Sequence, residues 1–97
     1  MKIAREGNRL VIDIHGMKAA EAKFRLEALI ESCGADIESI TVIHGFRNGQ
    51  TLKDMVRGEL AASRIKQIRS AYNAGQTVID LRKKKDFSNR YRRRQRN

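Results

Sequence analysis

The chain has 97 residues, of which 40% are apolar and 33% are charged, and its formal net charge is +10. These totals describe one small domain with a modest core, and no apolar run approaches the ~20 residues of a membrane span. We therefore expect a protein without a membrane partner. The first residues lack the apolar core of a secretory signal, and the single cysteine, Cys33, has no internal disulfide partner. Both features favour a cytoplasmic protein.

The positive charge is concentrated at the end of the chain. Residues 1–81 hold 12 Lys and Arg against 10 Asp and Glu, a balance of +2, whereas residues 82–97 hold nine against Asp86, a balance of +8. The basic residues of this tail are Arg82, Lys83, Lys84, Lys85, Arg90, Arg92, Arg93, Arg94 and Arg96. Runs of like charge without an apolar stripe repel one another and are typically disordered until a polyanion binds them. We therefore divide the chain into a domain at 1–81 and a basic, disordered, nucleic-acid-binding tail at 82–97.

Hydrophobic periodicity predicts six elements in the domain. Alternating or continuous apolar segments predict strands at 10–15, 39–44, 65–70 and 77–81. Apolar residues at three- and four-residue spacing predict helices at 18–33 and 52–63. Gly34 is expected to end the first helix in the left-handed conformation. Residues 1–9 are interpreted as a polar arm with a turn at Gly7 and Asn8; an additional strand there is considered but not included.

The resulting order, βαβαββ, predicts an α/β fold. Strands joined through a helix should pair in parallel, and the last two strands should be antiparallel. Two right-handed crossovers place both helices on one face of the sheet, which gives a two-layer α/β sandwich with one open face. Leu10, Ile12 and Ile14 should face the helices, so Asp13 and His15 should lie on the open side.

Two strands end in the same pair of residues, His15-Gly16 and His44-Gly45. Because the two pairs are one βαβ unit apart, both histidines should reach the same rim of the sheet. Asp13 is two residues before His15 and can orient its imidazole for acid–base chemistry. We take Asp13, His15 and His44 as the candidate catalytic residues.

The same rim is a candidate phosphate site. Both predicted helices begin there, and helix N-termini favour anions. The expected phosphate-binding residues are Gly16, Gly45, Arg47, Asn48 and Gly49.

Less specific interpretations apply to the same residues. A histidine at a strand end is commonly a structural hydrogen-bonding group. Two histidines and one carboxylate can also form a facial metal triad, although no fourth ligand is placed for it. We rank direct acid–base chemistry above metal binding and expect no required cofactor and no metal ligands.

Several motifs together resemble the Smr (small MutS-related) domain family, in a stand-alone small form. They are Ile12-Asp13-Ile14-His15-Gly16-Met17, Ile43-His44-Gly45 and Gly75-Gln76-Thr77-Val78-Ile79-Asp80-Leu81. The resemblance spans residues 10–81 and implies a fold similar to the C-terminal domain of translation initiation factor three. It also implies nucleic-acid binding and, in many members, endonuclease activity, with the family's Asp-x-His element on Asp13 and His15. Arg47 stands where the family usually has a second glycine.

These observations lead us to expect a monomeric, cytoplasmic nucleic-acid-binding protein with endonuclease activity, with RNA favoured over DNA as substrate and the ribosome as a further partner. In this mechanism one histidine is the general base and the other the general acid. The alternative is a non-catalytic module that binds nucleic acid or the ribosome through the same rim. A third interpretation is a phosphate- or nucleotide-binding domain without a polymer partner.

Overall fold

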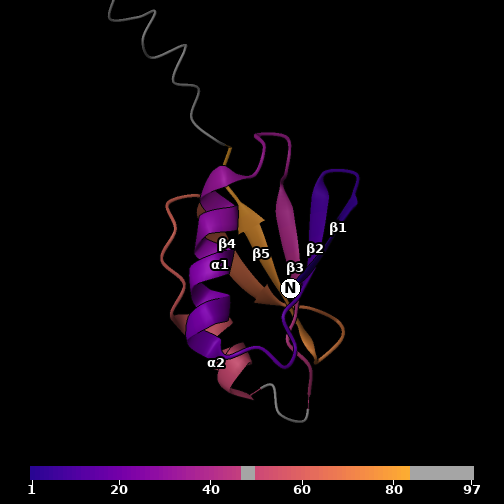
Figure 1. The fold of residues 1–97 in the computed structure, drawn as a ribbon. Coiled ribbons are helices and arrows are strands. Elements are labelled where there is room, and N and C mark those ends of the chain that lie inside the picture. Colours follow the sequence, from indigo (N-terminus) through magenta and orange to yellow (C-terminus); the bar gives the residue numbers. More distant parts are fainter. Residues whose placement is uncertain (47–49, 84–97) are drawn as a thin grey trace, which may run out of the picture.

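The structure is a computed structural model that describes residues 1–46 and 50–83. It contains a five-stranded sheet and two helices (Figure 1). In chain order, the elements are β1 (Lys2–Glu6), β2 (Arg9–Asp13), α1 (Ala19–Ser32), β3 (Ser39–Ile43), α2 (Gln50–Gly58), β4 (Ile65–Ser70) and β5 (Gln76–Leu81). The α/β class predicted from the sequence is confirmed.

The N-terminal segment forms a strand that the sequence analysis left out. β1 pairs antiparallel with β2, in a register that sets Ile3 opposite Ile12 and Glu6 opposite Arg9. The two strands form a hairpin whose turn contains Gly7 at φ 63°. All five residues of β1 are exposed. Its sequence therefore lacks the apolar alternation by which a half-buried strand is recognised. The element order is therefore ββαβαββ.

The strand order is β1-β2-β3-β5-β4. β2 and β3 pair in parallel, and β4 and β5 pair antiparallel, as expected. β5 lies between β3 and β4 and pairs antiparallel with both. β3 and β4 consequently run in the same direction but do not pair with each other, because β5 lies between them. The expected parallel pairing of these two strands is therefore wrong.

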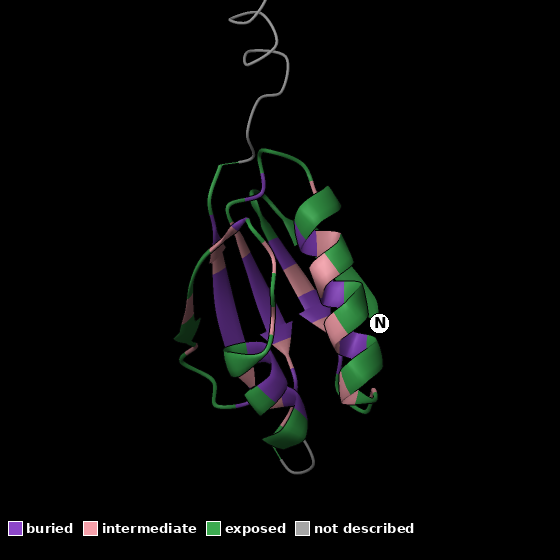
Figure 2. Ribbon diagram, turned by 90° about the vertical axis from the view of Figure 1, so that its left-hand side faces the viewer, coloured by how far each residue is buried: buried purple, intermediate pink, exposed green. Residues whose placement is uncertain are grey.

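Both helices pack against one face of the sheet (Figure 2). α1 buries Ala22, Leu26 and Ile30, and α2 buries Leu52, Met55 and Val56. Leu10 and Ile12 of β2, and Ile14 directly after it, enter the same core, as predicted from their alternation. In the described part of the chain, neither helix is long and apolar enough to cross a membrane.

α2 begins and ends earlier than predicted. It ends at Gly58, five residues before the expected end, because glycine is a poor helix former and the following residues find partners outside the helix. The Glu27 carboxylate of α1 accepts the amide of Ala61 at 2.6 Å, and Glu31 accepts the amide of Ser63 at 2.8 Å. Two glutamates on the exposed face of α1 therefore hold the connection between α2 and β4.

The C-terminal end of α1 is held by a buried arginine instead of the expected left-handed Gly34. The cap residue Cys33 is extended (φ −66°, ψ 157°), and Gly34 is not among the glycines with positive φ. Arg64 is only 5% exposed and donates to the carbonyl oxygens of Ile30, Cys33 and Ile37, among others. Because these carbonyls lie at and just beyond the negative end of α1, they stabilise the buried cation.

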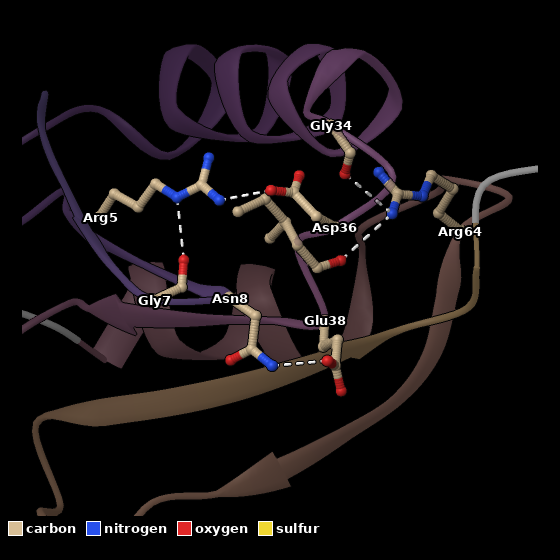
Figure 3. A network of polar contacts seen from close by, with 8 residues as sticks. Arg5, Gly7, Asn8, Gly34, Asp36, Glu38 and Arg64 are labelled. Atoms are coloured by element: carbon tan, nitrogen blue, oxygen red, sulfur yellow. Dashed lines mark hydrogen bonds and ion pairs between the residues drawn. The ribbon is translucent and has the colours of Figure 1, made fainter.

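Figure 3 shows this end of the sheet, where further polar contacts tie the β1–β2 turn to the segment after α1. Arg5 forms an ion pair with Asp36, and Asn8 donates to the carboxylate of Glu38. This polar network lies at the end of the sheet where β2 and β3 begin, opposite the end that carries His15 and His44.

Candidate functional site

Asp13 and His15 form a hydrogen-bonded pair at the carboxyl end of β2. One carboxylate oxygen, Oδ1, accepts the backbone amide of His15 at 3.0 Å and also contacts Nδ1 of the His15 ring. Since a carboxylate oxygen accepts hydrogen bonds, Nδ1 carries a proton and donates it to Asp13, and Nε2 is the ring nitrogen left for other partners. The His15 side chain is 67% exposed. The pair therefore presents an oriented imidazole to solvent.

The ionisation of Asp13 suits this arrangement. Partial burial raises the pKa of Asp13, but the hydrogen bonds from the side chain and backbone of His15 outweigh it, with help from the charges of His15 and Lys2. The net effect holds the pKa of Asp13 below its usual value of 3.8. Asp13 is therefore an anion at neutral pH and orients the ring as an acceptor.

The two His-Gly segments lie side by side, as their spacing predicts. β2 and β3 end together, with Asp13 opposite Ile43, and the amide of Ile14 donates to the carbonyl of Ile43 at 2.9 Å. A Cβ built on Gly45 would lie 3.7 Å from Cβ of His15. Gly16 and Gly45 adopt φ values of 80° and 86°, which permits the sharp turn after each histidine.

His44, in contrast, does not share the exposed rim. It is 1% exposed, and both ring nitrogens have partners inside the protein. Nδ1 donates to the carbonyl of Gly45 at 3.1 Å, and Nε2 lies 2.9 Å from the hydroxyl of Thr77. The prediction that His44 and His15 meet in one solvent-reachable pocket is therefore wrong for His44. The alternation that turns Ile40 and Val42 toward the helices also turns His44 that way.

The environment of His44 keeps it neutral. Burial lowers the pKa of His44 below its usual 6.5, and the charges of Arg57 and Lys53 lower it further, against the opposing effect of backbone hydrogen bonds. Arg57 Nε donates to the Thr77 hydroxyl at 3.0 Å, and that hydroxyl donates in turn to His44 Nε2. This chain of hydrogen bonds links α2, β5 and the end of β3. The sequence analysis missed Thr77, since a threonine within a strand carries no signal of such a partner.

The predicted phosphate-binding residues are only partly described. Gly16 and Gly45 lie at the rim, but the Gly45 amide donates to the carbonyl of Gly75 at 3.0 Å and is not free for a phosphate. Arg47, Asn48 and Gly49 lie outside the described residues. α1 begins beside the site at Ala19, and its cap residue makes no side-chain cap hydrogen bond.

The basic tail starts at the other end of the sheet. Arg82 is tied to the domain, since its amide donates to the carbonyl of Arg64 at 2.7 Å and its side chain donates to the carbonyl of Ile65 at 3.2 Å. Because β5 runs antiparallel to β3, Arg82 and Lys83 emerge away from Asp13 and His15 (Figure 1). The remaining tail residues proposed to bind nucleic acid, Lys84, Lys85, Arg90, Arg92, Arg93, Arg94 and Arg96, lie outside the described residues.

No cluster of three or more His, Cys, Asp and Glu side chains suited to a metal ion occurs within residues 1–46 and 50–83. Burial of His44 separates it from the exposed pair, so the three residues considered as a facial triad do not converge.

The fold and site together define a small α/β domain with an exposed Asp-x-His pair beside a turn that follows a neighbouring parallel strand. The Smr domain family model matches residues 12–82, and the chain belongs to this family. Smr domains are known as nucleic-acid-binding and nuclease-related.

A solved structure has the same fold. The crystal structure of the Smr domain of Thermus thermophilus MutS2 superposes with a TM-score of 0.58 at 24% sequence identity. The match covers 74% of this chain and 96% of that chain. No curated protein sequence matches the chain.

Proposed function

We propose that this protein is an endonuclease that cleaves RNA, with His15 as the acid–base group and Asp13 as the residue that orients it. The observation that supports this function is the exposed His15 ring, whose Nδ1 is bound to Asp13 while Nε2 has no hydrogen-bond partner among the described residues. An imidazole held in one tautomer by a carboxylate is suited to remove a proton from a hydroxyl group.

RNA is the favoured substrate because it carries its own nucleophile. In the proposed reaction, Nε2 of His15 takes the proton of a ribose 2′-hydroxyl, and the 2′-oxygen attacks the adjacent phosphorus. The bond from phosphorus to the 5′-oxygen breaks, and the leaving oxygen takes a proton from the protonated His15 or from water. The products are a 2′,3′-cyclic phosphate and a 5′-hydroxyl. A single exposed histidine is sufficient for this sequence of proton transfers.

The role first expected for His44 changes accordingly. Its neutral, buried ring fixes the turn after β3 through Gly45 and Thr77, and we assign it a positioning role without contact to the substrate.

The test uses labelled single-stranded RNA, the same RNA with one 2′-deoxyribose, and supercoiled plasmid, each with and without a chelator. We expect cleavage of the all-ribose RNA, loss of cleavage at the 2′-deoxy position, and a 2′,3′-cyclic phosphate on the 5′ product. Equal cleavage at the deoxy position, or unchanged cleavage by His15→Ala, would exclude the mechanism.

Burial of His44 also favours a second candidate, a non-catalytic module that binds nucleic acid or the ribosome. The exposed rim then has one acid–base histidine instead of two. In this case the labelled RNA binds but remains intact, and His15→Ala has no effect on either RNA or plasmid.

A further inference from the structure

The rim that carries His15 also carries two exposed aromatic side chains. Phe46 is 68% exposed and follows His44-Gly45, while Tyr72 is fully exposed in the turn between β4 and β5. In the described part of the chain, the remaining exposed aromatic side chain is Phe24, on α1. Exposed aromatic rings are therefore concentrated at the end of the sheet that bears the Asp13–His15 pair.

The Phe46 ring has a defined neighbour. A Cβ built on Gly75 would lie 3.4 Å from Cε2 of Phe46, and at the same distance from Oδ1 of Asn73 and the carbonyl carbon of Gly45. The edge of the ring therefore rests on a residue without a side chain, while most of the ring remains in solvent. Burial of the ring would be favourable, so its exposure does not stabilise the fold. An exposed ring of this kind is available to a ligand.

Tyr72 is attached to the same small unit. The Gly75 carbonyl accepts the amides of both His44 (2.9 Å) and Gly45 (3.0 Å), so the β4–β5 turn is bound directly to the turn after β3. A Tyr72-lined groove of about 550 Å³ continues from this turn across the uncovered face of the sheet. Tyr72 thus borders this groove, and Asn73, which lines it too, lies with the Phe46 ring beside Gly75. Phe46 in turn directly follows Gly45, on which a Cβ would lie 3.7 Å from Cβ of His15.

The charges in the groove are largely compensated. Arg9 forms an ion pair with Glu6, and Arg69 donates to both carboxylate oxygens of Asp80, at 2.7 and 3.2 Å. Phosphates therefore gain little from this surface beyond the rim. Ring faces, which stack on every base, are the feature that it offers.

From this arrangement we infer that the substrate is unpaired nucleic acid, and that Phe46 and Tyr72 are stacking platforms for bases next to the scissile phosphate. This inference rests on the nucleic-acid binding of the proposed function and specifies the class of substrate. A base in a duplex has both faces covered by its neighbours, so a duplex cannot use these rings without unstacking. The protein is expected to select single-stranded segments for this reason.

The test is a binding measurement with RNA that cannot be cleaved. A fluorescent single-stranded oligonucleotide of about eight nucleotides, with 2′-O-methyl riboses throughout, is compared with its duplex and with a version carrying one abasic site. We expect the single strand to bind more tightly than the duplex. Phe46→Ala and Phe46→Leu should weaken binding of the intact strand about 5- to 150-fold, the range for the loss of one base–aromatic stack.

Two controls make the result specific to stacking. Phe24→Ala removes another exposed phenylalanine, on α1, and should leave binding unchanged. Phe46→Leu keeps an apolar side chain next to Gly75, and a 2-aminopurine base in the strand should be quenched by the wild type but not by this variant. Tyr72→Leu should weaken binding in the same direction as Phe46→Leu.

The inference is overturned if Phe46→Leu binds as tightly as the wild type, if the duplex binds as tightly as the single strand, or if no probe binds. Its failure is separable from that of the proposed function. If Phe46→Leu cleaves ordinary RNA as well as the wild type and binds it equally tightly, the stacking inference alone is overturned. If bases stack on Phe46 but RNA is not cleaved, the endonuclease proposal alone is overturned.

Discussion

The Thr77 hydroxyl lies 2.9 Å from Nε2 of His44 and links the buried histidine to Arg57. The contact joins β5 and α2 to the turn after β3, which contains Gly45. It satisfies a ring nitrogen that is shielded from water, and a buried acceptor without a partner is costly.

Thr77→Val should therefore destabilise the protein by about 1–3 kcal/mol, because it keeps the shape of the side chain and removes its hydroxyl. Urea unfolding followed by circular dichroism measures this change. Thr41→Val, at a buried threonine of the adjacent strand on the uncovered face, is the matched control and should change stability by about 0.5 kcal/mol or less. Equal effects of the two substitutions would show that the hydrogen bond to His44 does not contribute to the free energy of unfolding beyond what any buried threonine contributes.

Stability should also depend on pH through His44. Its pKa is lowered in the folded protein by burial, so the unfolded chain binds a proton first as the pH falls. Stability from this group is complete well above pH 6.5 and is lost as the pH falls below about 6.5 toward the lowered value. Unfolding free energies measured between roughly pH 7.5 and 5.5 should decrease, and His44→Gln should reduce the slope. A slope unchanged in that variant would contradict this origin.

Asp13→Asn should reduce RNA cleavage while RNA binding is retained. The reduction can reach about 100- to 10,000-fold, the usual contribution of an acid–base group, because Asp13 orients the acid–base group His15. An amide in place of the carboxylate no longer fixes the proton of His15 on Nδ1. The measurement is the single-turnover cleavage rate, with binding of the 2′-O-methyl strand in parallel. Asp80→Asn is the control, since Asp80 is a strand carboxylate on the same face that is paired with Arg69. Equal rates for the two variants would remove Asp13 from the mechanism.

Much of the fold follows from local patterns in the sequence. Alternation in β2 and β3 and the three- and four-residue spacing in α1 determine which side chains enter the core, because these elements bury one face and expose the other. β1 has no such pattern, since its five residues are all exposed. The position of β5 between β3 and β4 likewise depends on long-range strand pairing, and local periodicity does not predict which strands pair.

The candidate site likewise has a part that follows from local sequence and a part that depends on distant residues. Asp13 and His15 are two residues apart in one chain segment, so their contact is predictable from strand geometry alone. The alternation of β3 sets His44 on the same side as Ile40 and Val42, so its burial could have been predicted from the sequence. Its hydrogen-bond partners could not, because Thr77 belongs to a distant strand and Arg57 to α2.

Arg64 provides a further test of the fold. Arg64→Ala should destabilise the protein by about 2–3 kcal/mol, because it removes charged hydrogen bonds to several carbonyl groups at the end of α1. Chemical unfolding measures the loss. Arg5→Ala is the control, since Arg5 is an exposed residue paired with Asp36 and should contribute about 1 kcal/mol or less. A similar loss for both would argue against a special role for the buried cation.

The basic tail should contribute more to the binding of long substrates than to that of short ones. β5 has six residues and therefore separates Arg82 from the rim by about 20 Å. Removing residues 84–97 should weaken binding of a strand of about 20 nucleotides and reduce its salt dependence, and should have a smaller effect on a strand of about six nucleotides. Fluorescence anisotropy at two salt concentrations measures both effects. An equal loss for the two lengths would place the tail next to the site instead.

The carbonyl of Gly75 accepts two amides from the turn after β3, so two loops from distant parts of the chain are fastened at a single atom. Insertions are commonly tolerated in hairpin connections, but a longer connection between β4 and β5 would withdraw this atom from both partners. Grafting a foreign loop at 71–75 would consequently alter the neighbourhood of His15, even though no residue of β2 or β3 had been exchanged.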